Sequence, residues 1–392
     1  MNPLTNQRTN QHTRQLTSQL THKRLTRLGP GLVVGLFALV FVALSLSVQN
    51  WDARSFALIG QRFEQRTASG SKGYDGQFAY YIATDPIGAA DNMDAAAYRY
   101  LRIVYPALGW LLSLGGQAAL APWALIGINV VALGAIAILL GELLARLGAS
   151  RWYGLGVPLT AGMLFALRAD LNEPLALALA LGAIVALSDT YRQEGTGNWL
   201  LVTVLLALSA LTKETGYIYA GGVVLGLLAA RRWRRAIGVG LGTLGPALVW
   251  GLLISAWLGQ SPFATERTQF EAIPFGGLPY LEPPPAQLIL VIWIVIPCLV
   301  LAALLIRDAR RGEHGLFALL LSANLLFVMF LPRASYIDAF AVLRLAAGML
   351  AAAFLWLAAT GRRRWLPYFA ALWLPSGVLL LVLPGVLAGH AG

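Results

Sequence analysis

Charged residues are scarce in this chain of 392 residues. They make up 12% of it, whereas about a quarter of the residues in soluble domains are charged. Hydrophobic residues make up 58%, which is more than a water-soluble fold can bury. These two fractions exclude a soluble enzyme, a soluble DNA-binding protein and a disordered chain, and they indicate a polytopic membrane protein.

Cysteine and histidine are nearly absent. The single cysteine, Cys298, excludes a disulfide within the chain, and its apolar surroundings in the sequence predict a small buried hydrophobe. The four histidines show no metal-ligand spacing, so we expect no histidine-based metal site. The net charge of +11 would suggest nucleic acid in a soluble protein, but cytoplasmic loops of membrane proteins also collect Lys and Arg. We therefore expect no nucleic-acid partner.

Long apolar runs recur along the whole chain. A membrane-spanning helix needs about 20 apolar residues, and a lipid-exposed backbone must satisfy its own hydrogen bonds. The runs predict an all-α fold with about eleven transmembrane helices, at residues 31–49, 119–141, 153–167, 174–188, 199–212, 215–230, 236–258, 286–306, 315–331, 339–360 and 365–387. We expect residues 1–30 to form a cytoplasmic tail and residues 50–118 a long extracytoplasmic loop. A helix bundle then occupies residues 119–392, with a second outer loop at 259–285.

The topology depends on one short apolar segment, residues 103–114. Twelve residues are too few to cross a bilayer, and Tyr105, Pro106 and Trp110 favour an interfacial or re-entrant helix. Without this segment as a span, 18 of the 29 basic residues fall on the side of the N-terminus, and 13 of the 18 acidic residues fall on the other side. This asymmetry predicts a cytoplasmic N-terminus.

Three groups of charged residues flank apolar runs of only 14–16 residues. Such runs reach at most about 24 Å, less than the hydrocarbon thickness of about 30 Å, so the flanking charges lie at membrane depth or line a cavity. The groups are Arg168, Asp170 and Glu173, then Lys213 and Glu214, then Arg333, Asp338 and Arg344. Helix-end ion pairs or snorkelling side chains would also explain each group alone. Their placement on the side of the first loop favours a shared polar cavity.

The first loop carries the densest motif, GYDGQFAYYIATDP at residues 73–86. The glycines around Asp75 predict a turn, and the apolar residues after it predict a short amphipathic helix lying on the membrane, with the Asp75 carboxylate at its start. The simpler interpretation of Asp75 is a helix cap, and that of Asp85 before Pro86 is a turn residue.

A second string, YRYLRIVYP at residues 98–106, places Arg99 and Arg102 on one helix face. We expect these arginines either to meet lipid phosphates or to pair with Asp91 and Asp94. The two aspartates also have the spacing of a metal pair, but a solvated helical turn is the simpler interpretation.

These two strings resemble a family of bacterial membrane proteins tied to cell-surface glycopolymer formation. More widely, the layout resembles the GT-C glycosyltransferases, such as the protein O-mannosyltransferases and the aminoarabinose transferase of lipid A. The resemblance implies a GT-C-like fold in the bacterial inner (plasma) membrane, with an extracytoplasmic active site and juxtamembrane helices in the first loop. This chain has Asp-Gly at residues 75–76, where the mannosyltransferases have an acidic pair.

The resemblance implies transfer of a sugar from a polyprenyl-phosphate donor to a saccharide, lipid or protein acceptor, with Asp75 as the general base. Membrane lipids would surround the protein. The phosphate-binding candidates are Lys213, Arg168, Arg344 and Arg102, and the supporting residues are Tyr74, Gln77, Tyr81, Asp85, Arg99, Asp170, Glu173 and Glu214. Lysine and arginine can neutralise a phosphate, so we expect no cofactor. A divalent metal is compatible with such chemistry, but no residue pattern indicates one.

Two other functions compete with transfer: a transporter or flippase of lipid-linked saccharides, and a non-catalytic subunit of a glycan assembly complex. Buried charges also mark the substrate pathways of transporters. The sequence shows no internal repeat, however, and its polar groups crowd one face. An outward cavity lined by Asp75, Arg168 and Lys213 would favour transfer, whereas a central cavity between two pseudo-symmetric halves would favour transport.

Overall fold

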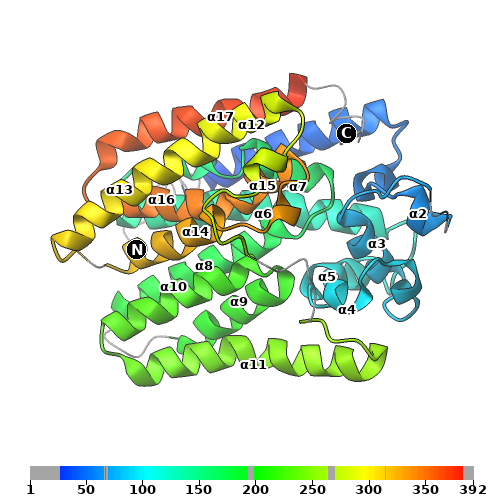
Figure 1. The fold of residues 1–392 in the computed structure, drawn as a ribbon, viewed down its shortest axis with the longest axis horizontal. Helices are drawn as coiled ribbons and strands as arrows, with labels where there is room; N and C mark the ends of the chain where they lie inside the picture. Colours follow the sequence, from blue (N-terminus) through cyan, green and yellow to red (C-terminus); the bar gives the residue numbers. More distant parts are fainter. Residues whose placement is uncertain are drawn as a thin grey trace, which may run out of the picture.

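A computed structural model describes residues 27–65, 67, 69–192, 198–263, 270–313 and 315–382. Most of the expected cytoplasmic tail, the middle of the second outer loop and the end of the last apolar run lie outside these residues. Within the described ranges every regular element is a helix and no strand occurs (Figure 1). The expected all-α class is therefore confirmed for this part of the chain.

Five helical segments are long and apolar enough to cross a membrane. They are Arg27–Val48, α6 (Ala121–Arg146), α8 (Glu173–Arg192), α11 (Trp233–Leu258) and Pro284–Arg310, the last made of α12 (Pro284–Leu290), a π-helical turn (Val291–Val295) and α13 (Ile296–Arg310). A sixth candidate is α15 (Ala339–Leu345) with α16 (Ala347–Ala359), bent by 42° at Ala346. These helices identify a membrane protein. In the described residues they account for five or six of the eleven expected spans.

Four further apolar runs form shorter helices. They are α9 (Trp199–Thr212), α10 (Thr215–Ala229), α14 (Leu316–Met329) and α17 (Leu366–Val382). α9 ends at Thr212, just before Lys213, and α10 begins just after Glu214. Both boundaries agree with those expected from the positions of the charges.

The run at residues 153–167 does not form one continuous helix, so that prediction is wrong. The chain instead makes a 3₁₀ helix, η3 (Arg151–Gly156), and then α7 (Ala161–Arg168). Pro158 and two glycines lie at the break. A side chain at Gly154 would collide with the carbonyl oxygen of Ala137, so η3 packs directly on the α6 backbone because it has glycine there.

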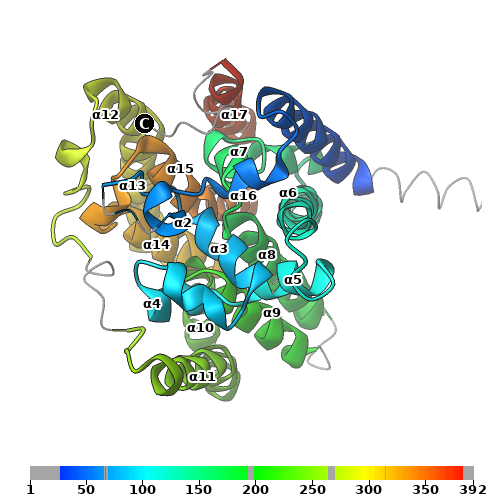
Figure 2. The same ribbon diagram turned by 90° about the vertical axis from the view of Figure 1, so that its right-hand side faces the viewer.

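The first loop folds into short helices gathered at one end of the bundle (Figures 1 and 2). They are η1 (Ala53–Ala57), α2 (Gln61–Glu64), α3 (Gly76–Thr84), η2 (Gly88–Asn92), α4 (Ala96–Tyr100) and α5 (Val104–Leu112). α5 is the short helix expected within residues 103–114. α3 also forms where expected, but seven of its nine residues are buried. The prediction of an amphipathic helix lying on the surface is therefore wrong. Gly76 packs against the backbone at Ala169, where a side chain would collide.

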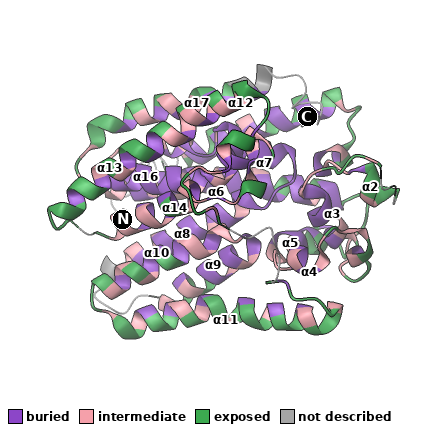
Figure 3. Cartoon of the chain, viewed as in Figure 1, coloured by how far each residue is buried: buried purple, intermediate pink, exposed green. Residues whose placement is uncertain are grey.

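Helix α16, at the centre of the bundle, is buried at eleven of its thirteen residues (Figure 3). It is rich in alanine, and small residues let neighbouring helices approach closely. Exposed residues follow the outer helices α11, α13 and α17 (Figure 3). On α11 the exposed side chains are large and apolar, including Leu241, Leu248 and Leu252, as a lipid-facing surface requires.

Candidate functional site

Eight charged residues meet where the first loop packs on the helix bundle. We call them the charge cluster: Asp75, Asp94, Arg99, Arg102, Glu173, Lys213, Glu214 and Arg344. They come from α3, α4 and the turns beside it, the start of α8, the turn between α9 and α10, and α15. Four are acidic and four are basic, so the formal charge of the cluster is zero.

Asp75 lies at the centre of the charge cluster. Its Oδ1 accepts a hydrogen bond from Arg99 Nη1 at 2.9 Å, and its Oδ2 lies 3.5 Å from Arg344 Nη2 and 3.7 Å from Arg102 Nη1. Asp75 occupies the N-cap position of α3, but its side chain makes no capping hydrogen bond. Asp75 thus occupies the turn before α3, as the simpler interpretation expected, but its carboxylate does not cap the helix and instead contacts three guanidinium groups.

Arg99 and Arg102 each donate hydrogen bonds to both oxygens of a second carboxylate. Arg99 donates to Asp94 at 2.9 and 3.0 Å, one of the pairings expected from the sequence. Arg102 Nε donates to both oxygens of Glu214, at 2.9 and 3.1 Å. Its Nη2 also donates to the Tyr98 hydroxyl. Such forked, charge-assisted bonds fix the direction of a guanidinium group as well as its position.

The inner end of the charge cluster is centred on Glu173. One oxygen, Oε1, contacts both Lys213 Nζ at 2.9 Å and Arg344 Nη1. All three side chains are at most 7% exposed. Glu173 begins α8, where the positive end of the helix dipole adds to the stabilisation of its negative charge.

Two of the acids are more exposed to solvent than any of the bases. The side chains of Asp75 and Glu214 are 29% and 35% exposed, whereas no cation of the cluster exceeds 11%. A solute that approaches from solvent therefore meets two carboxylates before it meets the cations. Carboxylates of this kind suit the hydroxyl groups of a sugar or of an acceptor.

The ionisation of Asp75 follows from this arrangement. Burial alone raises the pKa of its carboxyl, but the surrounding guanidinium groups, Arg99 foremost, outweigh burial and hold that pKa well below the usual aspartate range. Asp75 is therefore ionised at neutral pH, and its negative charge stabilises the folded protein.

This shift predicts a pH dependence of stability. A carboxylate with a lowered pKa contributes its stabilisation above the unfolded-state pKa and loses it as the pH falls through the folded-state pKa. The difference in unfolding free energy between wild type and Asp75→Asn is therefore expected to stay constant from about pH 7 to 5 and to shrink below about pH 4. Denaturant unfolding in detergent across this range measures it. A difference that grows on acidification would contradict the assignment.

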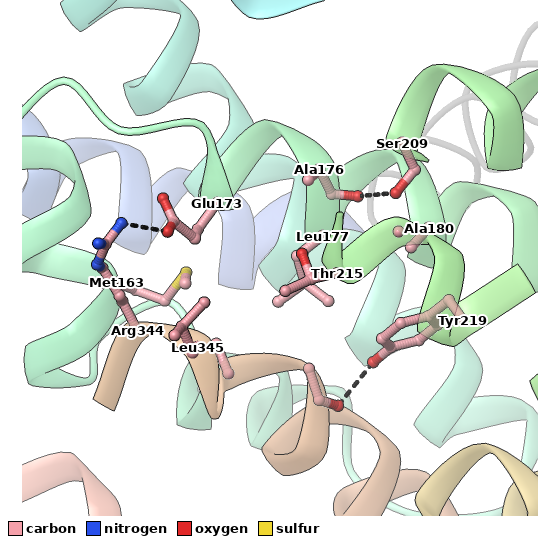
Figure 4. Close-up of a pocket in the computed structure, with 13 residues that line it drawn as sticks. Met163, Glu173, Ala176, Leu177, Ala180, Ser209, Thr215, Tyr219, Arg344 and Leu345 are labelled. Carbon is pink, nitrogen blue, oxygen red and sulfur yellow. Dashed lines mark hydrogen bonds and ion pairs between the residues drawn. The ribbon is translucent and has the colours of Figure 1, made fainter. Parts of the chain in front are cut away.

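A small cavity extends from the Glu173–Arg344 pair between α7, α8, the α9–α10 pair and α15–α16 (Figure 4). Its remaining wall is mostly apolar, with Leu177, Ala180 and Leu345 among its residues. Glu173 Oε2 and Arg344 Nε are buried and have no hydrogen-bond partner among the described residues. The cavity is thus charged at one end and apolar beyond it.

Two predicted supporting residues hold the loop around Asp75. The Tyr74 hydroxyl donates to Asp338 Oδ2 at 3.0 Å, and the Arg344 guanidinium lies 5.4 Å from the centre of the Tyr74 ring. Gln77 accepts from the Gly60 amide at 3.1 Å and donates to the Lys72 carbonyl at 2.8 Å. Both residues position the turn that carries Asp75.

Other predicted site residues lie outside the charge cluster. Asp85 accepts hydrogen bonds from the amides of residues 87 and 88, which confirms its interpretation as a turn residue. Arg168 donates to the Ser55 carbonyl at 2.9 Å and lies over the Phe56 ring. These further placements complete the set: Asp170 is fully buried with φ +46°, Tyr81 packs beside Tyr80, and the exposed Arg333 lies over the Tyr280 ring.

Two tyrosines of the site were not predicted from the sequence. Tyr98 bonds to Arg102, and Tyr219 lines the cavity, where its hydroxyl donates to the Gly348 carbonyl at 2.8 Å. Tyr98 begins the YRYLRIVYP string, and its position four residues before Arg102 on a helix could have predicted this contact. Tyr219 lies in an apolar run with no such marker.

No protein-family model matches the chain, and neither does any of the curated proteins or solved structures compared with it.

Proposed function

We propose that the protein is a membrane glycosyltransferase of GT-C type that moves a sugar from a polyprenyl-phosphate donor to an extracytoplasmic acceptor in cell-surface glycopolymer or glycolipid formation. One observation carries this proposal: the partly exposed carboxylate of Asp75 lies among Arg99, Arg102 and Arg344. A base for an acceptor hydroxyl and cations for a phosphate are thus within a few ångströms of each other. Transfer from a phosphate leaving group needs both.

In the proposed reaction the acceptor oxygen bonds to the anomeric carbon while the bond from that carbon to the phosphate oxygen breaks. Asp75 takes the acceptor proton, and the bonding electrons leave with the phosphate. The phosphodiester of the donor carries one negative charge, and the released polyprenyl phosphate carries nearly two at neutral pH because its second pKa is about 6. Arg344, Arg102 and Lys213 are the cations that would stabilise this added charge.

The same cations explain how the base would become active. In the resting protein three guanidinium groups hold Asp75 ionised and weakly basic. A bound phosphate would compete with the carboxylate for these groups, and each contact that Asp75 loses raises its basicity. Donor binding would therefore prepare Asp75 to accept a proton.

The cavity beyond Arg344 favours a lipid-linked donor. It begins at a charged residue of the cluster and continues between apolar helices of a membrane protein. Hydrocarbon next to a phosphate would find apolar contacts there, while the acceptor would approach Asp75 from the solvent side.

The proposal includes the membrane topology. We infer that α9, α10, α14, α17 and the broken η3–α7 segment also cross the bacterial inner membrane, which together with the six candidates makes about eleven spans. The N-terminus is then cytoplasmic and the charge cluster lies outside. Three of the basic residues expected on the cytoplasmic side form ion pairs that are separate from the charge cluster. They are Arg146 with Asp189, Arg151 with Glu142, and Arg362 with Asp308. A flippase is less favoured because the charge cluster lies where the first loop packs on the bundle.

The test is transfer of labelled sugar by purified protein in lipid nanodiscs, with a panel of polyprenyl-phosphate sugars. We expect one donor to yield labelled product, and Arg102→Gln to lower kcat/KM about 10²-fold because a donor to the developing charge is lost. Arg307→Gln, a half-exposed arginine of α13, is the matched control and is expected to keep wild-type transfer. Transport would be favoured instead if no donor gave labelled product and if the protein, reconstituted in vesicles, moved lipid-linked saccharide across the vesicle membrane.

A further inference from the structure

The segment that carries Arg99 and Arg102 has little structure of its own. α4 is only five residues long, and Arg102 lies in the turn that follows it. A helix this short is not stable in isolation, because nucleation costs more than its few hydrogen bonds return. Contacts from elsewhere in the protein must therefore hold the two guanidinium groups in place.

Tyr100 lies between the two arginines and packs away from the charge cluster. It is 1% exposed, and its ring meets the Trp257 ring edge-on at 4.9 Å between centres. Its hydroxyl donates to the Pro86 carbonyl at 2.9 Å. The segment is thus held by contacts on two sides. Carboxylates bind its arginines, and α11 and the turn before η2 contact its tyrosine.

The α11 contact includes a hydrogen bond to the backbone of the segment. The indole Nε1 of Trp250 donates to the Tyr100 carbonyl at 2.7 Å. Trp250 and Trp257 lie seven residues apart, two turns along one face of α11. Ile254, on the same face, is fully buried against the ring of Tyr100 and its neighbours. This face of α11 is therefore built to receive the segment, whereas the opposite face is exposed and apolar.

We propose that Trp250 is a positioning residue, which holds the two arginines in the charge cluster through its hydrogen bond to the Tyr100 carbonyl. The hydrogen-bond donor is a side chain of the membrane-spanning helix α11, so the position of α11 sets the position of Arg99 and Arg102. Among the described residues, this is the hydrogen bond that joins the α4 backbone to a side chain of α11. The inference rests on the proposed function only for its ligand-binding readout.

The first experiment measures directly how much the Trp250 hydrogen bond stabilises the segment at residues 96–102. Trp250→Phe keeps an aromatic ring and removes the N–H, and hydrogen–deuterium exchange is followed in peptides that cover residues 96–102. We expect exchange about fivefold faster there, with residues 76–84 unchanged, because the net loss is about one hydrogen bond. Trp233→Phe, an exposed tryptophan at the other end of α11, is the control and is expected to leave exchange unchanged. Unchanged exchange in Trp250→Phe would overturn the inference, whatever the protein binds.

The second experiment tests whether the Trp250 hydrogen bond affects the affinity of the charge cluster for an anion. Hexyl phosphate is titrated into nanodisc-embedded protein, and we expect Trp250→Phe to bind it about fivefold more weakly, a loss equal to one net hydrogen bond. In an Arg102→Gln, Arg99→Gln background the tryptophan substitution is expected to have no further effect, because it acts through those side chains. An additive loss would indicate a general structural role and would overturn the positioning role. If wild type binds no hexyl phosphate, the proposed function fails, and exchange at residues 96–102 alone decides the inference.

Discussion

Asp75→Asn is expected to lower sugar transfer about 10²- to 10⁴-fold, the range in which general bases contribute, without weakening phosphate binding. Asparagine has nearly the shape of aspartate but accepts no proton at neutral pH. The substitution also removes one negative charge from a cluster of four acids and four bases, so it leaves a net positive charge beside any bound anion. Hexyl phosphate should therefore bind at least as tightly as it does to wild type.

This opposite response of transfer and binding separates the role of a base from that of a structural anchor. Labelled-sugar transfer and hexyl phosphate titration are measured on the same nanodisc preparation. Asp91→Asn makes the same substitution at an exposed position of the first loop and should change neither quantity. Transfer near the wild-type rate in Asp75→Asn would remove Asp75 from the base role. Loss of both transfer and binding would make it a structural residue instead.

Glu173→Gln is expected to lower the free energy of unfolding by about 3–5 kcal/mol, the range measured when one partner of a buried ion pair is removed. Glu173 is 3% exposed and contacts Lys213 and Arg344 through one oxygen. Glutamine would leave both buried cations without this carboxylate. Denaturant unfolding in detergent measures the change.

Two variants make this second prediction specific. Asp189→Asn removes a carboxylate of the same helix that pairs with Arg146 but is 47% exposed. An exposed pair is worth about 0–1 kcal/mol, so little stability should be lost. Glu173→Gln combined with Lys213→Met should recover part of the loss, because one uncompensated charge is then gone. Equal stability of Glu173→Gln and wild type would mean that the buried charges are not coupled as the distances indicate.

Local features of this fold were predictable where the physical cause is local. α5 and α3 form where turn residues and apolar spacing predicted short helices, and α9 and α10 meet at Lys213 and Glu214 as the charges predicted. The break before α7 was not predicted because a hydropathy pattern carries no information on how the backbone packs. Pro158 lies between η3 and α7, and Gly154 packs against the α6 backbone, a contact between separate elements.

The burial of α3 was missed for a related reason. Its sequence combines large apolar residues with small ones, and this composition fits either a helix on a membrane surface or one packed among other helices. The bundle decides between them, because Gly76 lies directly against the backbone at Ala169. Arg168 was expected among the phosphate-binding residues, yet it donates to the Ser55 carbonyl at the start of the loop.

The sequence by itself determined that this chain belongs in a membrane, that its described elements are helices, and that charged residues flank short apolar runs. Each of these follows from the hydrophobic effect and from backbone hydrogen bonding within a single segment. Only the tertiary structure decided which charges meet. Asp75 and Arg344 are 269 residues apart, and Arg102 and Glu214 are 112 apart. Coulomb attraction depends on distance in space, and the packing of α3, α4, α8 and α15 sets that distance.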